Sequence, residues 1–156
     1  MADAPFFPLF VNLSCARVLI VGAGHIALRR ASALIPFARD ITVVAPGVLP
    51  ALEQMAREGS IALIRRCFQA DDLEQMHMVL AATNNTRLNA EIGALCHEKG
   101  VLFNNASDQK QCDFFFPGIA RRENIVIGVS ASGANHTLTK QLTERLNRWD
   151  WMENDL

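Results

Sequence analysis

A glycine-rich turn near the amino end of the chain carries the clearest chemical signal in the sequence. The apolar residues 18–21 lead directly into Gly22-Ala23-Gly24, and residues that favour helix, beginning with His25-Ile26-Ala27, follow. Gly22 permits a tight turn, Gly24 lets a diphosphate approach the backbone, and small Ala27 lets a helix pack closely on the strand. The N–H groups and the positive dipole end of that helix would bind the phosphates. The alternative interpretation is a purely structural turn without a ligand.

The elements that must position this turn alternate between strand and helix patterns. One helix is expected from Gly24 to near Pro36, a second from Pro50 to Gly59, and a third ends at Gly100. This alternation predicts a Rossmann-type α/β fold, in which a parallel sheet carries helices on both faces. The apolar or β-branched segments that predict its strands are residues 18–21, 41–45, 61–64, 78–82 and 101–103.

The pattern changes after residue 113. Phe114–Phe116 and Ile125–Val129 flank the polar residues 121–124, which predicts an antiparallel β-hairpin. We expect this hairpin and a final amphipathic helix to form the self-association surface of a homodimer, with packing on the sheet as the alternative. The apolar stripe of the helix consists of Leu138, Leu142 and Leu146.

The length of 156 residues is enough for one domain with a substantial core and a short appendage. We therefore predict a dinucleotide-binding Rossmann domain over residues 1–113 and a dimerisation segment over residues 114–156. The net charge of −1 argues against a general nucleic-acid or membrane-surface binder. No apolar run approaches the ~20 residues of a membrane span, and the amino end does not have the pattern of a signal peptide, so we expect a cytoplasmic protein.

Four cysteines are scattered along the chain, and no Cys/His pair has the spacing of zinc ligands, so no metal site is predicted. We expect these cysteines to be reduced thiols that are mostly buried. The sequence contains no tyrosine, which excludes a tyrosine general acid.

Several further motifs match one known family. In chain order the matching pieces are Phe7-Pro8-Leu9-Phe10, Val21-Gly22-Ala23-Gly24-His25-Ile26-Ala27, Arg29-Arg30, Thr42-Val43-Val44-Ala45-Pro46, Ala81-Ala82-Thr83-Asn84, Asn89, Asn104, Cys112-Asp113-Phe114, Pro117 and Ser130-Ala131-Ser132-Gly133. With these pieces the chain resembles the N-terminal domain of siroheme synthase and its stand-alone relatives, the precorrin-2 dehydrogenases, some of which are also sirohydrochlorin ferrochelatases. The joint pattern is far more specific than the glycine motif alone.

The resemblance implies an NAD-dependent oxidoreductase that converts precorrin-2 to sirohydrochlorin in siroheme biosynthesis. It also implies a homodimer, and in some members of the family a further insertion of ferrous iron that gives siroheme. In this chain His25 and Ile26 would lie over the diphosphate of NAD, and Pro46-Gly47 near the adenosine ribose. Thr83-Asn84 would line the cleft after the fourth strand.

The chain departs from the family at the acid. The family's key aspartate lies a few residues after the asparagine that matches Asn104, and Ser107 stands at that position here. Serine cannot act as a carboxylate base, so either Asp108 takes the role after a one-residue adjustment of the loop, or activity is impaired. We predict Asp108 as the catalytic residue, an ordinary loop aspartate being the alternative. The chain ends at Leu156, so we expect it to lack the helical domain that usually follows in the family.

A polycarboxylate tetrapyrrole needs basic groups at its site, because guanidinium groups bind carboxylates in a bidentate manner. Arg29 and Arg30 are therefore candidate substrate-binding residues. Ser132 and His136, close to the start of the last helix, are two more. For each, a solvated surface or helix-terminal residue is the simpler alternative.

Two questions stay open at the level of sequence. The second strand ends in Val44-Ala45-Pro46, without the acidic residue that usually binds the ribose hydroxyls and without an arginine for a 2′-phosphate. NAD rather than NADP is therefore supported mainly by the resemblance. The alternative function is a non-catalytic module that binds NAD or a tetrapyrrole for sensing or delivery. An unrelated NAD(P)-linked dehydrogenase would need a substrate domain for which the chain has no room.

Overall fold

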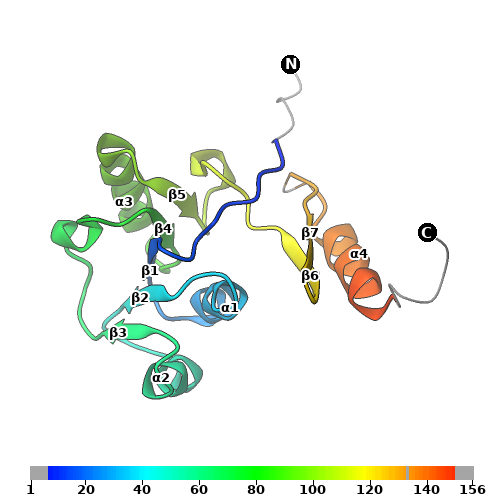
Figure 1. The fold of residues 1–156 in the computed structure, drawn as a ribbon. Helices are drawn as coiled ribbons and strands as arrows, with labels where there is room; N and C mark the ends of the chain where they lie inside the picture. Colours follow the sequence, from blue (N-terminus) through cyan, green and yellow to red (C-terminus); the bar gives the residue numbers. More distant parts are fainter. Residues whose placement is uncertain (1–6, 133, 150–156) are drawn as a thin grey trace. The chain divides into compact units, whose positions relative to one another are not determined.

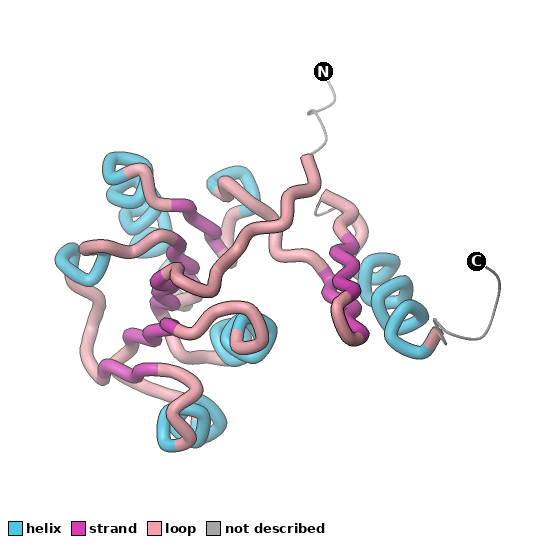
Figure 2. The backbone as a smooth tube through the Cα atoms, in the orientation of Figure 1, coloured by secondary structure: helices cyan, strands magenta, loops and turns pink. Residues whose placement is uncertain are grey.

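In the computed structural model of the chain, the described residues are 7–132 and 134–149. They fall into two compact units, one spanning Phe10–Phe114 and one made of the described parts of Met1–Leu9 and Phe115–Leu156. Figure 1 labels the helices and strands and colours them along the chain, and Figure 2 shows the same backbone by element type. In order they are β1 (Arg17–Val21), α1 (His25–Leu34), β2 (Asp40–Val44), α2 (Pro50–Arg57), β3 (Ala62–Ile64), the 3-10 helix η1 (Ala70–Leu73), β4 (Met78–Ala81), α3 (Thr86–Lys99), β5 (Leu102–Asn105), the 3-10 helix η2 (Gln109–Gln111), β6 (Gly118–Arg122), β7 (Ile125–Val129) and α4 (His136–Arg148).

The unit spanning Phe10–Phe114 is built on a five-stranded parallel sheet in the order β3-β2-β1-β4-β5. Its register brings the strand ends Val21, Val44, Ala81 and Asn105 to the same edge of the sheet. The strand order reverses between β1 and β4, and ligands of such sheets bind outside the carboxyl ends of the strands at this point. The predicted Rossmann-type fold is confirmed.

Helices cover both faces of this sheet. Because the connections between parallel strands are right-handed, α1 and α2 lie on one face and α3 on the other (Figure 1). α1 contacts the sheet through fully buried Ala27 and Ala31. The predicted helix limits are also confirmed, since α1 ends before Pro36, α2 begins at Pro50, and α3 ends where Gly100 adopts a φ of +67°.

β5 extends two residues further than predicted, through Asn104 and Asn105. Both asparagines are buried at 4% exposure. An apolar pattern does not reveal such a strand end, because side-chain hydrogen bonds rather than hydrophobic burial accommodate the two amides.

In the second unit, the predicted hairpin is confirmed but its first strand was misplaced. β6 pairs with β7 from Gly118 to Arg122, so Phe114–Phe116 precede the strand. Arg122 pairs with Ile125, and the turn is only Glu123-Asn124, in which Glu123 has a φ of +49°. Pro117 lacks the N–H that a paired strand needs, which is why the phenylalanine run does not continue the ladder.

The cysteines are free, but the expectation that they are mostly buried was wrong. Cys96 is buried in the core, Cys112 is half-buried, and Cys15 and Cys67 are exposed in connecting segments. No helix in the described part of the chain is both long and apolar enough to cross a lipid bilayer.

Candidate functional site

Gly22 places the end of β1 directly against the end of β4. Its φ of +103° lies in the left-handed region, and a Cβ there would lie 2.5 Å from the carbonyl oxygen of Ala82 and 3.0 Å from the nitrogen of Thr83. Its N–H donates to the carbonyl oxygen of Val44 at 2.9 Å. The close approach of three strand ends therefore requires glycine at this position.

Gly24 is the N-cap of α1 and leaves that helix end accessible. Among the described residues no side chain caps α1, and its first turn holds no acidic residue. A Cβ at Gly24 would meet no atom within 4 Å, and the side chains of His25 and Ile26 are exposed. The N–H groups of a first helical turn bind anions, so this end fits the diphosphate of a dinucleotide.

The segment after β2 lies beside the glycine turn. The N–H of Leu49 donates to the carbonyl oxygen of Ala23 at 3.2 Å, and buried Ala45 donates its N–H to Ile64 at 3.1 Å. Pro46 and Gly47 are exposed between these two anchors. Their proposed position near the adenosine ribose stays a prediction.

A buried amide fixes the segment after β4. Asn89 on α3 is completely buried. Its Oδ1 accepts the N–H of Thr83 at 3.3 Å and the Thr83 hydroxyl at 2.6 Å, while its Nδ2 donates to the carbonyl oxygen of Thr83 at 3.1 Å and to Ser107 Oγ at 3.0 Å. These four bonds use the whole hydrogen-bonding capacity of an amide. Asn84 is exposed next to this anchored residue.

Sequence reasoning matched Asn89 to the family but gave it no role. The signal was present, because Asn89 precedes the buried residues Ile92 and Cys96 by three and seven positions and so falls on the apolar stripe of α3. A polar residue on such a stripe must find partners inside the protein.

The segment after β5 carries the predicted acid. Ser107 donates both its hydroxyl and its N–H to Asn105 Oδ1, at 2.7 and 2.9 Å. Asn105 in turn donates from Nδ2 to Gln111 Oε1 at 3.0 Å. The half-buried Asp108 accepts the N–H of Lys110 at 3.0 Å and caps η2, which leaves its carboxylate further acceptor capacity.

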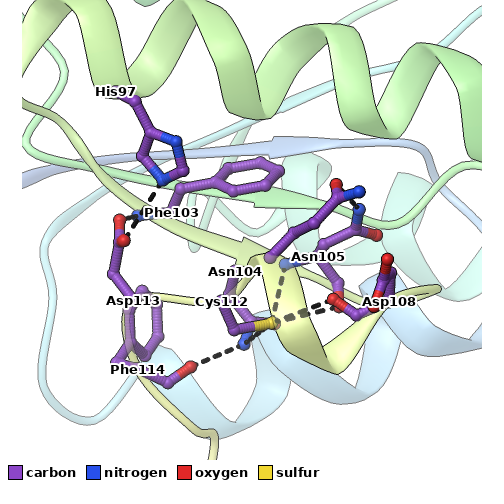
Figure 3. Close-up of polar contacts among 9 residues, drawn as sticks. His97, Phe103, Asn104, Asn105, Asp108, Cys112, Asp113 and Phe114 are labelled. Carbon is purple, nitrogen blue, oxygen red and sulfur yellow. Dashed lines mark hydrogen bonds and ion pairs between the residues drawn. The ribbon is translucent and has the colours of Figure 1, made fainter.

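The thiol of Cys112 holds the other end of this loop against β5 (Figure 3). Sγ accepts the N–H of Asn105 at 3.2 Å and Asn104 Nδ2 at 3.4 Å. It also lies within donating distance of the carbonyl oxygens of Asn105 and Asp108, at 3.3 and 3.5 Å. Burial raises the pKa of the Cys112 thiol, which keeps it protonated at neutral pH.

Asp113 fastens the chain beside β5 where the loop ends. Its Oδ2 accepts the N–H of Phe103 at 2.8 Å, its Oδ1 lies 3.2 Å from His97 Nε2, and its N–H donates to the carbonyl oxygen of Phe103 at 2.9 Å (Figure 3). Asn104 Nδ2 donates to the carbonyl oxygen of Phe114 at 2.9 Å. These contacts hold the loop that carries Asp108 at both ends.

Arg29 and Arg30 lie on α1, whose amino end faces the strand ends. Arg29 is exposed and Arg30 is half-buried. Burial, with a smaller contribution from Arg29, lowers the pKa of Arg30 to about 10, so Arg30 is still charged at neutral pH.

The last two predicted site residues belong to the second unit. Exposed His136 begins α4, which Asn135 caps by accepting the N–H of Leu138 at 2.9 Å. Ser132 is exposed, has a φ of +47°, and donates its N–H to Ser130 Oγ at 3.2 Å. No group of three or more His, Cys, Asp or Glu side chains that could hold a metal ion is present in the described residues.

Comparison with known proteins agrees with this architecture. The chain matches the model of a family described as "Putative NAD(P)-binding" over residues 9–118. It is 36% identical over 141 residues to siroheme synthase 1 of Serratia proteamaculans (strain 568), and 38% identical over 142 residues to siroheme synthase of Baumannia cicadellinicola subsp. Homalodisca coagulata. Each match covers 90% of this chain, and the chain spans only 30% of the length of these curated relatives.

Among solved structures, the chain is similar to "SirC, precorrin-2 dehydrogenase" with a TM-score of 0.78 and 27% sequence identity. That match covers 93% of this chain and 72% of the other. These similarities confirm the resemblance inferred from the sequence motifs, and they confirm the fold class.

Proposed function

The chain belongs to the family described as "Putative NAD(P)-binding", and from this premise we propose that it is an NAD-dependent precorrin-2 dehydrogenase that forms sirohydrochlorin in siroheme biosynthesis. The observation that carries the proposal is the open glycine turn at the reversal of strand order, two strands from a loop with an acid. The similarity to a precorrin-2 dehydrogenase and to siroheme synthases supports the choice of substrate.

In this proposal the first unit binds the dinucleotide at the carboxyl edge of its sheet. Gly22-Ala23-Gly24 and the N–H groups of His25 and Ile26 hold the diphosphate. Pro46-Gly47 contact the adenosine ribose, and Thr83-Asn84 line the cleft beyond it. NAD⁺ supplies a hydride acceptor when bound.

Oxidation of precorrin-2 removes one hydride and one proton from the macrocycle. Asp108 accepts the proton, since its carboxylate is half-buried and already oriented by Lys110. Arg29 and Arg30 bind substrate carboxylates, and the charge retained by Arg30 supports this role. Ser132 and His136 are further proposed substrate contacts.

We further propose a cytoplasmic homodimer that associates through residues 114–156. The exposure of two large apolar side chains on α4, Leu138 at 45% and Leu142 at 39%, supports this surface. Insertion of ferrous iron, as a second substrate, stays a prediction in which Asp108 accepts the pyrrole protons.

The test combines binding and turnover on the purified chain. Calorimetry measures NAD⁺ uptake, and absorbance follows NADH after precorrin-2 is added. We expect uptake and NADH formation, and we expect Gly24→Asp to abolish both while circular dichroism shows a folded protein, because a carboxylate opposes the diphosphate. Uptake of NAD⁺ without NADH would favour the non-catalytic module. Absence of uptake by the folded native chain would overturn the proposal.

A further inference from the structure

The loop that carries Asp108 is joined to the segment after β4 by a continuous chain of side-chain hydrogen bonds. Thr83 binds Asn89, Asn89 binds Ser107, and Ser107 binds Asn105. This series of hydrogen bonds runs from the end of β4, through α3, to the loop after β5. Two segments proposed for different tasks, cofactor contact and proton transfer, are therefore linked by one buried amide.

Ser107 Oγ is the acceptor that this amide requires. Asn89 is completely buried, and one of its two N–H groups points to Ser107 while the other binds the carbonyl oxygen of Thr83. Without the Ser107 oxygen, the completely buried Asn89 would lose one of its hydrogen-bond partners, and leaving a buried donor unsatisfied is unfavourable. The hydrogen bond to Asn89 thus fixes where residue 107 can lie.

The other side of Ser107 is fixed as well. Its hydroxyl and its N–H both donate to Oδ1 of Asn105, which is 4% exposed on β5. A residue held from two elements has little freedom, and the peptide that follows leads directly to Asp108. The position of the acid is therefore set by the preceding hydroxyl.

We propose that Ser107 is a positioning residue whose hydroxyl latches the Asp108 loop to Asn89, and through Asn89 to Thr83. The proposal rests on the proposed function of Asp108. It extends that function by assigning to Ser107 the control of the distance between Asp108 and Thr83, which is proposed to line the cofactor cleft. Ser107 does not act as a base. Its hydroxyl is a neutral group that accepts from Asn89 and donates to Asn105 at the same time.

Two substitutions at one position separate the hydroxyl from the size of the side chain. Ser107→Ala removes the latch, while Ser107→Thr keeps it. Ser14→Ala is the matched control, because Ser14 is exposed in the segment before β1, at the opposite edge of the sheet. Ser107 is itself exposed, so we expect Ser107→Ala to fold.

The first readout is amide hydrogen exchange of residues 105–111 without cofactor or substrate, which does not depend on activity. We expect about tenfold faster exchange in Ser107→Ala, the effect of losing one ordinary hydrogen bond, and no acceleration in Ser107→Thr or Ser14→Ala. Exchange in Ser107→Ala at the native rate would overturn the latch.

The second readout separates turnover from binding. We expect kcat of Ser107→Ala to fall about tenfold with the Kd for NAD⁺ within about twofold of native, and Ser107→Thr to recover most of kcat. Faster exchange with unchanged kcat would overturn the positioning role, and so would an equal loss in Ser107→Thr. A native chain without turnover would instead overturn the proposed function, and the exchange experiment would then decide the latch alone.

Discussion

Two glycines of one motif are required for different physical reasons. The fold requires glycine at position 22, because its φ is +103° and a Cβ would lie 2.5 Å from the backbone oxygen of Ala82, directly after β4. Gly24 has open space around it and ordinary backbone geometry. The first glycine therefore serves the fold and the second serves the proposed ligand, a distinction that the sequence pattern alone does not make.

Alanine substitutions test this distinction. We expect Gly22→Ala to lower the free energy of unfolding by about 1–3 kcal/mol, because the clash involves backbone that cannot move freely. Gly24→Ala should leave that free energy within about 0.5 kcal/mol but weaken NAD⁺ binding at least about tenfold, since the new methyl group occupies the diphosphate position. Urea titration measures the free energy of unfolding, and calorimetry measures NAD⁺ binding. A loss of stability in Gly24→Ala together with native stability in Gly22→Ala would contradict our account.

Substitution of the acid tests the proposed chemistry. Asp108→Asn keeps the size and an acceptor for Lys110 but removes the base, so kcat should fall by about 10²- to 10⁴-fold while NAD⁺ affinity stays the same. Asp71 is an exposed residue of η1, and Asp71→Asn should leave kcat unchanged in the same assay of NADH absorbance. Native turnover in Asp108→Asn would remove Asp108 from the mechanism.

At the scale of elements, the sequence predicted what local patterns determine. Proline and glycine placed the limits of α1, α2 and α3, and continuous apolar runs located the five parallel strands. The pattern did not show that Asn104 and Asn105 continue β5, because hydrogen bonds to Phe114 and Gln111, rather than apolar contacts, accommodate these buried amides. It also misplaced β6, since three phenylalanines resemble a strand more closely than Gly118–Arg122 does.

The packing of α3 on β5 depends on a glycine in the helix. A Cβ at Gly93 would lie 2.6 Å from the ring of Phe103, which is completely buried. We expect Gly93→Ala to lower the free energy of unfolding by about 1–3 kcal/mol, despite the better helix propensity of alanine. Gly47→Ala, where a Cβ meets nothing within 4 Å, is the control in the same urea titration. An unchanged Gly93→Ala variant would mean that the helix can shift outward.

The segment from β3 to η1 should make part of the stability depend on pH. The Arg66 guanidinium binds Asp72 through two hydrogen bonds, one of them 2.8 Å long, and this contact lowers the pKa of the carboxyl group. A lowered folded-state pKa stabilises the fold above the unfolded value of about 3.9, and the contribution is lost as pH falls through the folded value. Asp72→Asn should therefore lower the free energy of unfolding at neutral pH and weaken its fall in acid. Equal acid sensitivity of variant and native chain in urea titrations would rule out this contribution.

At the scale of the whole molecule, the two units differ in how much of their packing the chain itself provides. The first unit buries a continuous core around β1 and β4, while α4 in the second has no buried residue. The exposed apolar side chains of α4, Leu138 and Leu142, are the surface that the proposed dimer would cover. The roles of Ser132 and His136 stay predictions.

The proposed dimer surface gives a test at this scale. Leu138→Lys combined with Leu142→Lys places two charges on the exposed stripe of α4 and should convert a native dimer to monomer in analytical ultracentrifugation. Asn147→Lys adds charge to an exposed position of the same helix away from that stripe and should leave the mass unchanged. A native chain that sediments as a monomer would contradict the dimer.

Backbone hydrogen bonds join the strand ends of the first unit and the segments that follow them. They run from the N–H of Gly22 to Val44, of Leu49 to Ala23 and of Ala106 to Ala81. The carboxyl ends of the strands, where a nucleotide would bind, are therefore ordered before binding. Binding then costs little conformational entropy of the backbone, so the affinity should reflect direct contacts rather than a coupled folding step.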